Sequence, residues 1–324
     1  MKRSRIYMGL ILLALIAVIF FASYSLINMN REEGKSQVSV IVDNSNEDRW
    51  IAMREGLEQA ANDFDIELNY VSTGKMTSVT EEQDLINREV ENGVDGLIIQ
   101  LISSYGNTEY LDGITGSCKL VLMENDSSPE GTYPTVQADN WQIGVNLLQE
   151  MEKQEDRKLD ELKIGILSGN QNQTAMTERL NGLKEALGKR KTYISWTINT
   201  TTDDLAKKLN KTLDKHPVDI IFSLGNDETE TAVDVLATKP DRVNYDLYGV
   251  GCSDKNVYYL DKGYIKALIV PNEFNMGYQS VEKVAEQITN KLDVVEGITV
   301  EDLIVTKDNL YDEDTEKTLF PIVQ

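Results

Sequence analysis

The feature that most constrains the fold of this chain is a regular alternation of short apolar runs and amphipathic segments between residues 38 and 292. The apolar runs predict buried strands at 38–42, 66–71, 96–101, 119–123, 163–167, 192–198, 219–223, 246–250 and 265–270. The segments between them have apolar residues at helical spacing and predict helices at 50–62, 78–92, 140–152, 174–187, 202–215, 228–237 and 276–292. Strands that alternate with helices favour parallel sheets with helices on both faces.

The alternation runs through two successive sets, each of about 100–130 residues, which is a usual size for one domain. A chain of 324 residues is long enough to bury two hydrophobic cores. We therefore predict an α/β fold with two Rossmann-like lobes built on parallel sheets. Such sheets bind ligands beyond the carboxyl ends of their strands, so a hinged cleft between the lobes is the predicted site.

The first thirty residues differ from the rest of the chain. Lys2, Arg3 and Arg5 precede an uncharged run from residue 6 to residue 27, which is long enough to cross a hydrocarbon core of about 30 Å as a helix. The basic flank orients the following body to the extracytoplasmic side. We predict one N-terminal transmembrane helix within residues 1–30, retained as a membrane anchor, and a linker at 31–37. The alternative is a signal peptide that is cleaved, which releases a secreted body.

The charge and the reactive side chains exclude several classes of function. With 54 acidic and 32 basic residues the net charge is −22, which opposes nucleic-acid binding. A single His makes a His-rich metal site impossible and a serine–histidine triad improbable. The chain has no GxGxxG, P-loop or G-x-S-x-G motif. We predict a binding protein without a cofactor rather than an enzyme, in which Cys118 and Cys252 are free thiols.

Six segments in a fixed order carry a resemblance to one family. They read VSVIVDNSNEDRWIAMREGLEQAA, VDGLIIQLIS, ADNWQIGVNLLQEM, IGILSGNQNQTAMTERLNGLKEAL, VDIIFSLGNDETETAVDVL and YGVGCSDKNVYYLDKGYIKALIVPNEFNMGYQSVEKVAEQI. Together they resemble the type I periplasmic binding proteins of the ribose/galactose group, whose fold is shared with the effector domain of LacI-type repressors. The resemblance implies lobes of separated pieces, at 38–138 plus 272–300 and at 139–271 plus 301–324. A membrane segment stands where LacI-type repressors have a helix-turn-helix, which disfavours a transcription factor.

The same resemblance implies which residues contact a ligand. The implied contacts in the first lobe, together with Trp141 just after the first crossing between lobes, are Asn46, Glu47, Trp50, Ser103, Glu124, Asn125 and Trp141. Those in the second lobe are Thr177, Asn226 and Ser253. Where family members often have Arg, Arg, Asp and Gln, this chain has Asn125, Thr177, Ser253 and Pro271, which argues against a simple pentose or hexose. Trp50 as a core aromatic and Asn226 as a helix cap are open alternatives.

The resemblance also implies a role. We expect a membrane-tethered receptor for a carbohydrate or similar small polar solute, whose closure is read by an ABC importer permease or a sensor histidine kinase in the membrane. The alternative is an interaction module of the same fold that has lost small-ligand binding.

Overall fold

A computed structural model describes residues 35–45, 50–127, 133–158, 161–188, 193–199, 204–239, 245–290 and 296–319. The predicted transmembrane helix and two predicted contacts, Asn46 and Glu47, lie outside these ranges. Within them, no helix has both the length and the apolar character needed to cross a membrane. Residues 37–324 form one compact unit that contains both sheets and their buried cores, so it can be studied without the N-terminal segment.

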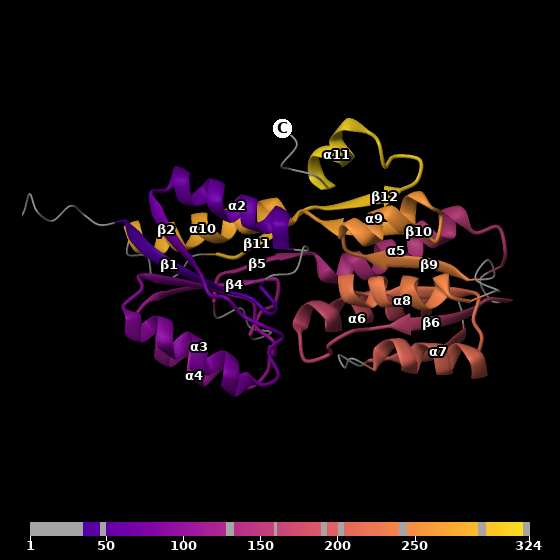
Figure 1. The fold of residues 1–324 in the computed structure, drawn as a ribbon, viewed down its shortest axis with the longest axis horizontal. Helices are drawn as coiled ribbons and strands as arrows, with labels where there is room; N and C mark the ends of the chain where they lie inside the picture. The colour runs from indigo at the N-terminus through magenta and orange to yellow at the C-terminus, as the bar shows by residue number, and fades with distance from the viewer. Residues whose placement is uncertain are drawn as a thin grey trace, which may run out of the picture. The chain divides into compact units, whose positions relative to one another are not determined.

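The first lobe is built on a six-stranded sheet with the order β11-β5-β4-β3-β1-β2. All pairings whose register is described in this sheet are parallel. Figure 1 shows α2 and α10 on one side of the sheet and α3 and α4 on the other. The elements of this lobe are β1 Ser36–Ile41, α2 Ile51–Asp63, β2 Ile66–Tyr70, α3 Val79–Asn92, β3 Gly96–Ile99, α4 Thr108–Thr115, β4 Lys119–Met123, β5 Thr135–Ala138, α10 Glu273–Asn290 and β11 Ile298–Val300.

The second lobe is built on another six-stranded sheet, with the order β12-β10-β9-β8-β6-β7. Its strands are parallel except β12, which runs antiparallel to β10. The predicted α/β fold of two parallel-sheet lobes is therefore confirmed. The elements of this lobe are α5 Asn140–Gln154, β6 Lys163–Leu167, α6 Thr174–Gly188, β7 Tyr193–Ile198, α7 Leu205–Lys215, β8 Ile220–Ser223, α8 Asn226–Ala237, β9 Asp246–Val250, α9 Asp254–Asp261, β10 Ile265–Pro271, β12 Asp302–Thr306 and α11 Glu313–Leu319.

Capping side chains and a glycine fix the helix ends that the sequence indicates. The Ser78 hydroxyl accepts a hydrogen bond from the Glu81 N–H at 3.2 Å and begins α3. Gly93 ends this helix in the left-handed conformation, with φ of +80°, which a glycine adopts without steric cost. The Asp139 carboxylate caps α5 in the same way, accepting from the Gln142 N–H at 2.9 Å.

The main helix pair of each lobe packs through two glycines. In the first lobe, a Cβ on Gly56 of α2 would lie 1.9 Å from the Phe274 carbonyl oxygen, and one on Gly277 of α10 would lie 2.2 Å from that of Met53. In the second lobe, a Cβ added to Gly144 of α5 or to Gly182 of α6 would lie 2.1 Å from a backbone carbonyl oxygen of the other helix. Side chains at these four positions would push the helices apart, so each lobe holds its helix pair in backbone contact.

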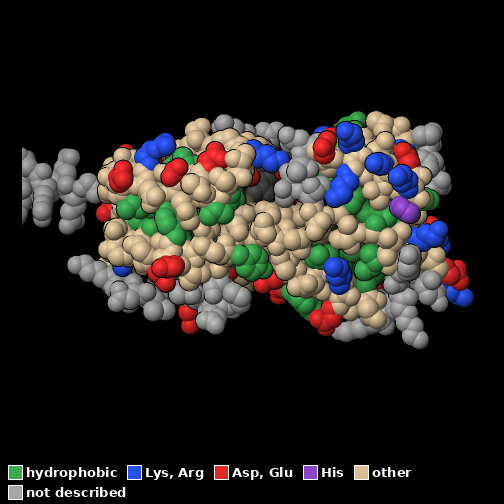
Figure 2. Space-filling model, turned by 90° about the horizontal axis from the view of Figure 1, so that it is seen from below, with side chains coloured by type: hydrophobic (Ala, Val, Ile, Leu, Met, Phe, Trp, Pro, Cys, Tyr) green, Lys and Arg blue, Asp and Glu red, His purple; other side chains and the backbone are tan. Residues whose placement is uncertain are grey.

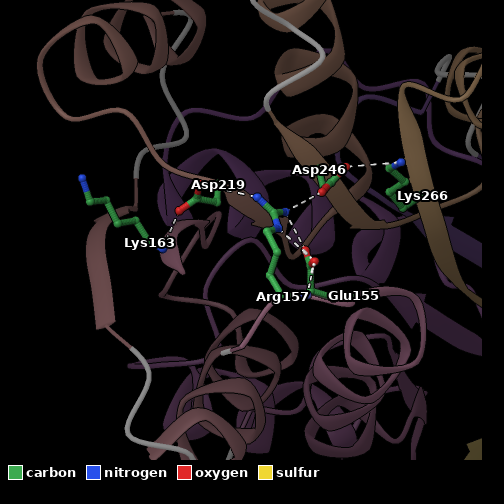
Figure 3. A network of polar contacts seen from close by, with 6 residues as sticks. All are labelled: Glu155, Arg157, Lys163, Asp219, Asp246 and Lys266. Atoms are coloured by element: carbon green, nitrogen blue, oxygen red, sulfur yellow. Dashed lines mark hydrogen bonds and ion pairs between the residues drawn. The ribbon is translucent and has the colours of Figure 1, made fainter. Parts of the chain in front are cut away.

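A cluster of charges holds the amino ends of the strands in the second sheet. Arg157, in the loop before β6, bonds to Glu155 at 2.5 Å, to Asp246 at 2.9 Å and to Asp219 at 3.6 Å (Figure 3). Lys266 adds a second contact to Asp246 at 3.3 Å. Three carboxylates from separate segments repel one another unless a cation lies between them, and Arg157 supplies that cation.

The chain passes between the two sheets three times. The passages follow β5 at 138–140, β10 at 271–273 and β11 at 300–302. The Asn272 N–H donates to the Glu301 carbonyl at 2.9 Å, which joins two of the passages. Short connections of this kind can act as the hinge of a two-lobe protein.

Substitution of Gly144 tests the close packing of the helices. We expect Gly144→Ala to lower the free energy of unfolding by about 2 kcal/mol or more, because its Cβ would overlap the Arg179 carbonyl of α6. Gly113→Ala is the control, since Gly113 lies in α4 with open space around it and should gain up to about 1 kcal/mol. Urea unfolding measures both variants. A Gly144→Ala protein as stable as the wild type would contradict the packing.

Candidate functional site

A cavity of about 500 Å³ lies between the carboxyl ends of the two sheets. Its walls come from the loops that follow β1, β2, β3 and β4 in the first lobe. In the second lobe they come from the loop between β6 and α6 and from the starts of α7 and α8. Most of the lining side chains are polar, and their carboxylates and amides are Asp43, Glu124, Asp227, Glu228, Asn44, Gln100, Asn170, Asn172, Gln173 and Asn226. Such a lining suits a ligand rich in hydroxyl or other polar groups.

In the first lobe, Gln100 organises the wall of the cavity. Its side chain is buried, accepts from the Asp43 N–H at 3.1 Å and donates to a Glu124 carboxylate oxygen at 2.6 Å. Glu124 has a φ of +66°, a left-handed conformation that is uncommon for Glu. The Asp43 carboxylate accepts from the Met76 N–H at 2.6 Å. The two acids of this wall are therefore fixed in position by the neighbouring strands.

In the second lobe, Asn226 organises the wall of the cavity. Its side-chain oxygen accepts from the Ser253 N–H at 3.2 Å and from the Asn256 amide at 2.9 Å. Asn226 begins α8, and Asp227 and Glu228 follow it in the first turn. A helix amino end stabilises these two carboxylates through its dipole. The wall thus presents anchored amide and carboxylate groups to the cavity.

The two lobes are in direct contact beside the cavity through residues 101–104, 125–126 and 170–175, which we call the interlobe clasp. Backbone contacts include the Ser104 N–H donating to the Asn172 carbonyl at 2.8 Å. The Thr174 hydroxyl accepts from the Asp126 N–H at 2.9 Å, and the Asn170 amide donates to the Ile102 carbonyl at 2.9 Å. These bonds join the two lobes directly on this side of the cavity.

Three of the predicted contacts meet at the cavity. Ser103, Glu124 and Asn226 all line it, two from the first lobe and one from the second. Asn125 is buried next to it in the interlobe clasp, where its side-chain oxygen accepts from the Ala175 N–H at 3.3 Å. Ser103 and Glu124 thus lie in the wall of the first lobe and Asn226 in that of the second, whereas the direct contact between the lobes was not predicted.

The other predicted contacts have different surroundings. Trp50 is buried and lines a second cavity of about 210 Å³ beneath α2, and its indole N–H donates to the Asp43 carbonyl at 3.2 Å. Trp141 is 39% exposed near the start of α5. The Thr177 hydroxyl donates to the carbonyls of residues 171 and 173. Ser253 caps α9 by accepting from the Asn256 N–H at 3.3 Å. None of these four residues is among the described residues that line the interlobe cavity.

Several lining residues were not predicted. Asp43 directly follows the first apolar run, and Gln100 interrupts the run GLIIQL near its end. Both are polar residues at the carboxyl end of a predicted parallel strand, and this position could have identified them as residues that line the cavity. Asp227 and Glu228 carry no such signal, because acidic residues in the first turn of a helix are common on stability grounds alone.

Glu82 is a buried acid directly behind the cavity wall. One carboxylate oxygen accepts from the Ile102 N–H at 2.8 Å, and the other has no hydrogen-bond partner among the described residues. Burial, together with the nearby Asp43 charge, raises the pKa of Glu82 to about 7, while the bond from Ile102 acts in the opposite direction. Glu82 thus titrates near neutral pH next to a loop that belongs to the clasp.

The described residues contain no group of three or more His, Cys, Asp or Glu side chains that could hold a metal ion. Cys118 and Cys252 form no disulfide in the described part of the chain. Burial raises the pKa of the Cys118 thiol to about 11, which keeps it protonated and unreactive at neutral pH.

Comparison with known proteins gives a family and several related folds. The model of the periplasmic binding protein domain matches residues 38–292. A carbohydrate transporter solute-binding protein from Agrobacterium radiobacter, solved with D-arabinose, has a TM-score of 0.79 and 14% identity over 88% of this chain and 99% of its own. GanP, a glucose-galactose binding protein from Geobacillus stearothermophilus, has a TM-score of 0.76 and 21% identity over 86% of this chain and 99% of its own.

A third solved structure, the XylFII-LytSN complex, has a TM-score of 0.74 and 17% identity over 85% of this chain and 98% of its own. A search of curated proteins found no match. The family and the first two structures are of binding proteins, which confirms the prediction of a binding protein rather than an enzyme.

Substitution of Glu82 tests the buried acid through pH dependence. Because its folded-state pKa lies above the ordinary value, its contribution to stability is complete at low pH and is lost as pH rises through about 7. We expect Glu82→Gln, which stays neutral and still accepts from Ile102, to exceed the wild type in stability at pH 8 by up to about 3 kcal/mol. The difference should disappear near pH 4.

Thermal unfolding from pH 4 to pH 8 measures this difference. Glu91→Gln is the control, because Glu91 is an exposed acid on the same helix. A Glu82→Gln difference that stays constant with pH would show that Glu82 does not titrate in this range.

Proposed function

Because this chain belongs to the periplasmic binding protein domain family, as the sequence resemblance predicted, we propose that it is an extracytoplasmic receptor for a carbohydrate or similar small polar solute. The observation that carries this proposal is the cavity of about 500 Å³ between the lobes, with anchored polar side chains on both walls. A ligand that contacts both walls favours the closed arrangement by its extra contacts there.

The related structures support the class of solute. Proteins of this fold were solved with D-arabinose and with D-allose, and one is described as a glucose-galactose binding protein. In this chain the described lining contains no aromatic side chain on which a sugar ring could stack. We infer that recognition relies on hydrogen bonds from Glu124, Ser103, Asn226 and their neighbours. Trp50, Trp141, Asn125, Thr177 and Ser253 remain predicted contacts.

The proposal includes attachment to the membrane and a membrane partner. The basic and uncharged N-terminal sequence favours a retained anchor, and the family supports a body outside the cytoplasm. Several related structures are of ABC transporter solute-binding proteins, which supports an importer permease as partner. XylFII, solved in complex with LytSN, supports a second possibility, in which the receptor binds a signalling protein such as a sensor histidine kinase.

The interlobe clasp favours a second candidate function. Its hydrogen bonds join the two lobes directly, and Asn170 and Gln173, which also line the cavity, use their side-chain amides for bonds across the interface. A protein whose lobes are joined in this way suits an interaction module that presents one fixed surface to a partner.

Ligand binding separates the two functions. We expect residues 35–324 to gain thermal stability with at least one member of a panel of pentoses, hexoses, polyols and amino sugars, because a ligand that binds only the folded state stabilises it. Calorimetric titration then measures affinity for each hit. No stabilisation by any panel member would reject the receptor and favour the interaction module.

A pair of variants tests whether the solute binds in the cavity. Glu124→Gln keeps the shape of the side chain but removes its charge, and we expect at least a tenfold loss of affinity because bonds to a charged acceptor are the stronger ones. Glu316→Gln is the control, since Glu316 is an exposed acid on α11, outside the cavity lining. Equal affinities of the two variants would place the solute elsewhere.

A further inference from the structure

Helix α7 has two chemically opposite faces. Leu205, Leu209 and Leu213 are buried in the core of the second lobe. The helix also carries four exposed lysines, which we call the basic face: Lys207, Lys208, Lys211 and Lys215. At about 100° per residue these four fall within an arc of about 100°, opposite the leucines, and they span about 12 Å along the helix axis.

The basic face has no partner of opposite charge in the described part of the chain, because none of its four lysines forms an ion pair there. Other surface lysines do: Lys255 lies 2.8 Å from Asp234, and Lys317 lies 2.6 Å from Glu313. The acid within α7, Asp214, is bonded to Lys239 at 2.7 Å and is therefore neutralised. Asp204 precedes the helix and makes no ion pair with it.

Figure 2 shows Lys and Arg side chains gathered beside the single His of the chain, His216, which directly follows α7. The chain has a net charge of −22, so it contains many acidic residues with which lysines can pair. Within the described part of the chain, these four lysines without an ion pair are therefore a local exception to the charge of the protein, and they attract an anionic surface.

The chemistry of the basic face favours a lipid surface over a protein. Protein interfaces are depleted in Lys and enriched in Arg and aromatic residues, and all the cationic residues of α7 are lysines. Lysines near anionic lipid headgroups each add about fivefold to membrane partitioning, and they need no shaped pocket. We propose that the basic face of α7 docks the body onto the anionic phospholipid headgroups of the membrane.

The rest of the molecule makes this docking directional. At physiological ionic strength charges are screened beyond about 8 Å, so the four lysines act locally although the whole protein is acidic. The acidic surfaces elsewhere on the protein are repelled by the same lipid. This step rests on the proposed membrane anchor: a linker at 31–37 would span at most about 25 Å and hold the body within reach of the bilayer. Leu205 and Ala206, at the start of α7, line the interlobe cavity, so docking turns that edge of the cavity toward the membrane.

Vesicle binding tests the proposal. Residues 35–324 are mixed with vesicles of phosphatidylcholine alone or with 30 to 40 per cent phosphatidylglycerol, roughly the anionic fraction that gives a strongly negative surface. We expect binding to the anionic vesicles only, and its loss in high salt. The variant Lys207→Gln/Lys208→Gln/Lys211→Gln/Lys215→Gln should lose at least tenfold in partitioning.

The control variant removes the same charge from dispersed positions, as Lys153→Gln/Lys158→Gln/Lys262→Gln/Lys317→Gln, and should bind like the wild type. Thermal unfolding confirms that both variants are folded. Equal losses in the two variants, or binding to phosphatidylcholine alone, would overturn the proposal. Binding of the basic face to poly-L-glutamate but not to anionic vesicles would also overturn it, in favour of an acidic protein partner.

Discussion

Parallel pairing of the strands is the constraint on which the cavity depends. A parallel sheet brings the carboxyl ends of its strands to one edge, so the loops after β1, β3 and β4 meet there, as do the loops after β6 and β8 in the second lobe. The central strands are buried and mostly apolar, and most of the polar side chains of the cavity come from the loops. At the opposite edge of the second sheet, the charged side chains have a structural role, because Arg157 contacts three carboxylates there (Figure 3).

Much of this architecture could be predicted from the sequence, because buried strands and amphipathic helices leave strong periodic patterns. Segments with weak patterns were missed, such as α4, α9 and the three-residue β11, whose places depend on contacts with distant segments. At the cavity, the predicted strand-end residues Ser103 and Glu124 lie in the lining, and their role as ligand contacts stays a prediction. Whether an aromatic such as Trp50 faces a cleft or packs beneath a helix depends on side-chain packing, which sequence spacing does not determine.

The glycine contacts and the interlobe clasp divide the molecule into parts of different stiffness. Gly56 and Gly277 in the first lobe, and Gly144 and Gly182 in the second, let the paired helices approach to backbone contact, which opposes sliding of the helices within a lobe. Movement is therefore left to the three connections between the sheets, where Asn272 bonds to Glu301. The hydrogen bonds of the clasp oppose that movement, and each of them is replaced by water when the lobes separate, so their net contribution to the cost of opening is small.

The interleaved lobes also set the order in which the protein can fold. The first lobe needs α10 to cover its sheet and β11 to complete its edge, and both lie after residue 272. A ribosome must therefore synthesise nearly all of the 324 residues before the first half of the structure can be finished. During that time the hydrophobic strands β1 to β5 lack their final partners. The first lobe therefore acquires its complete core after most of the chain has been synthesised, and not segment by segment as the chain emerges.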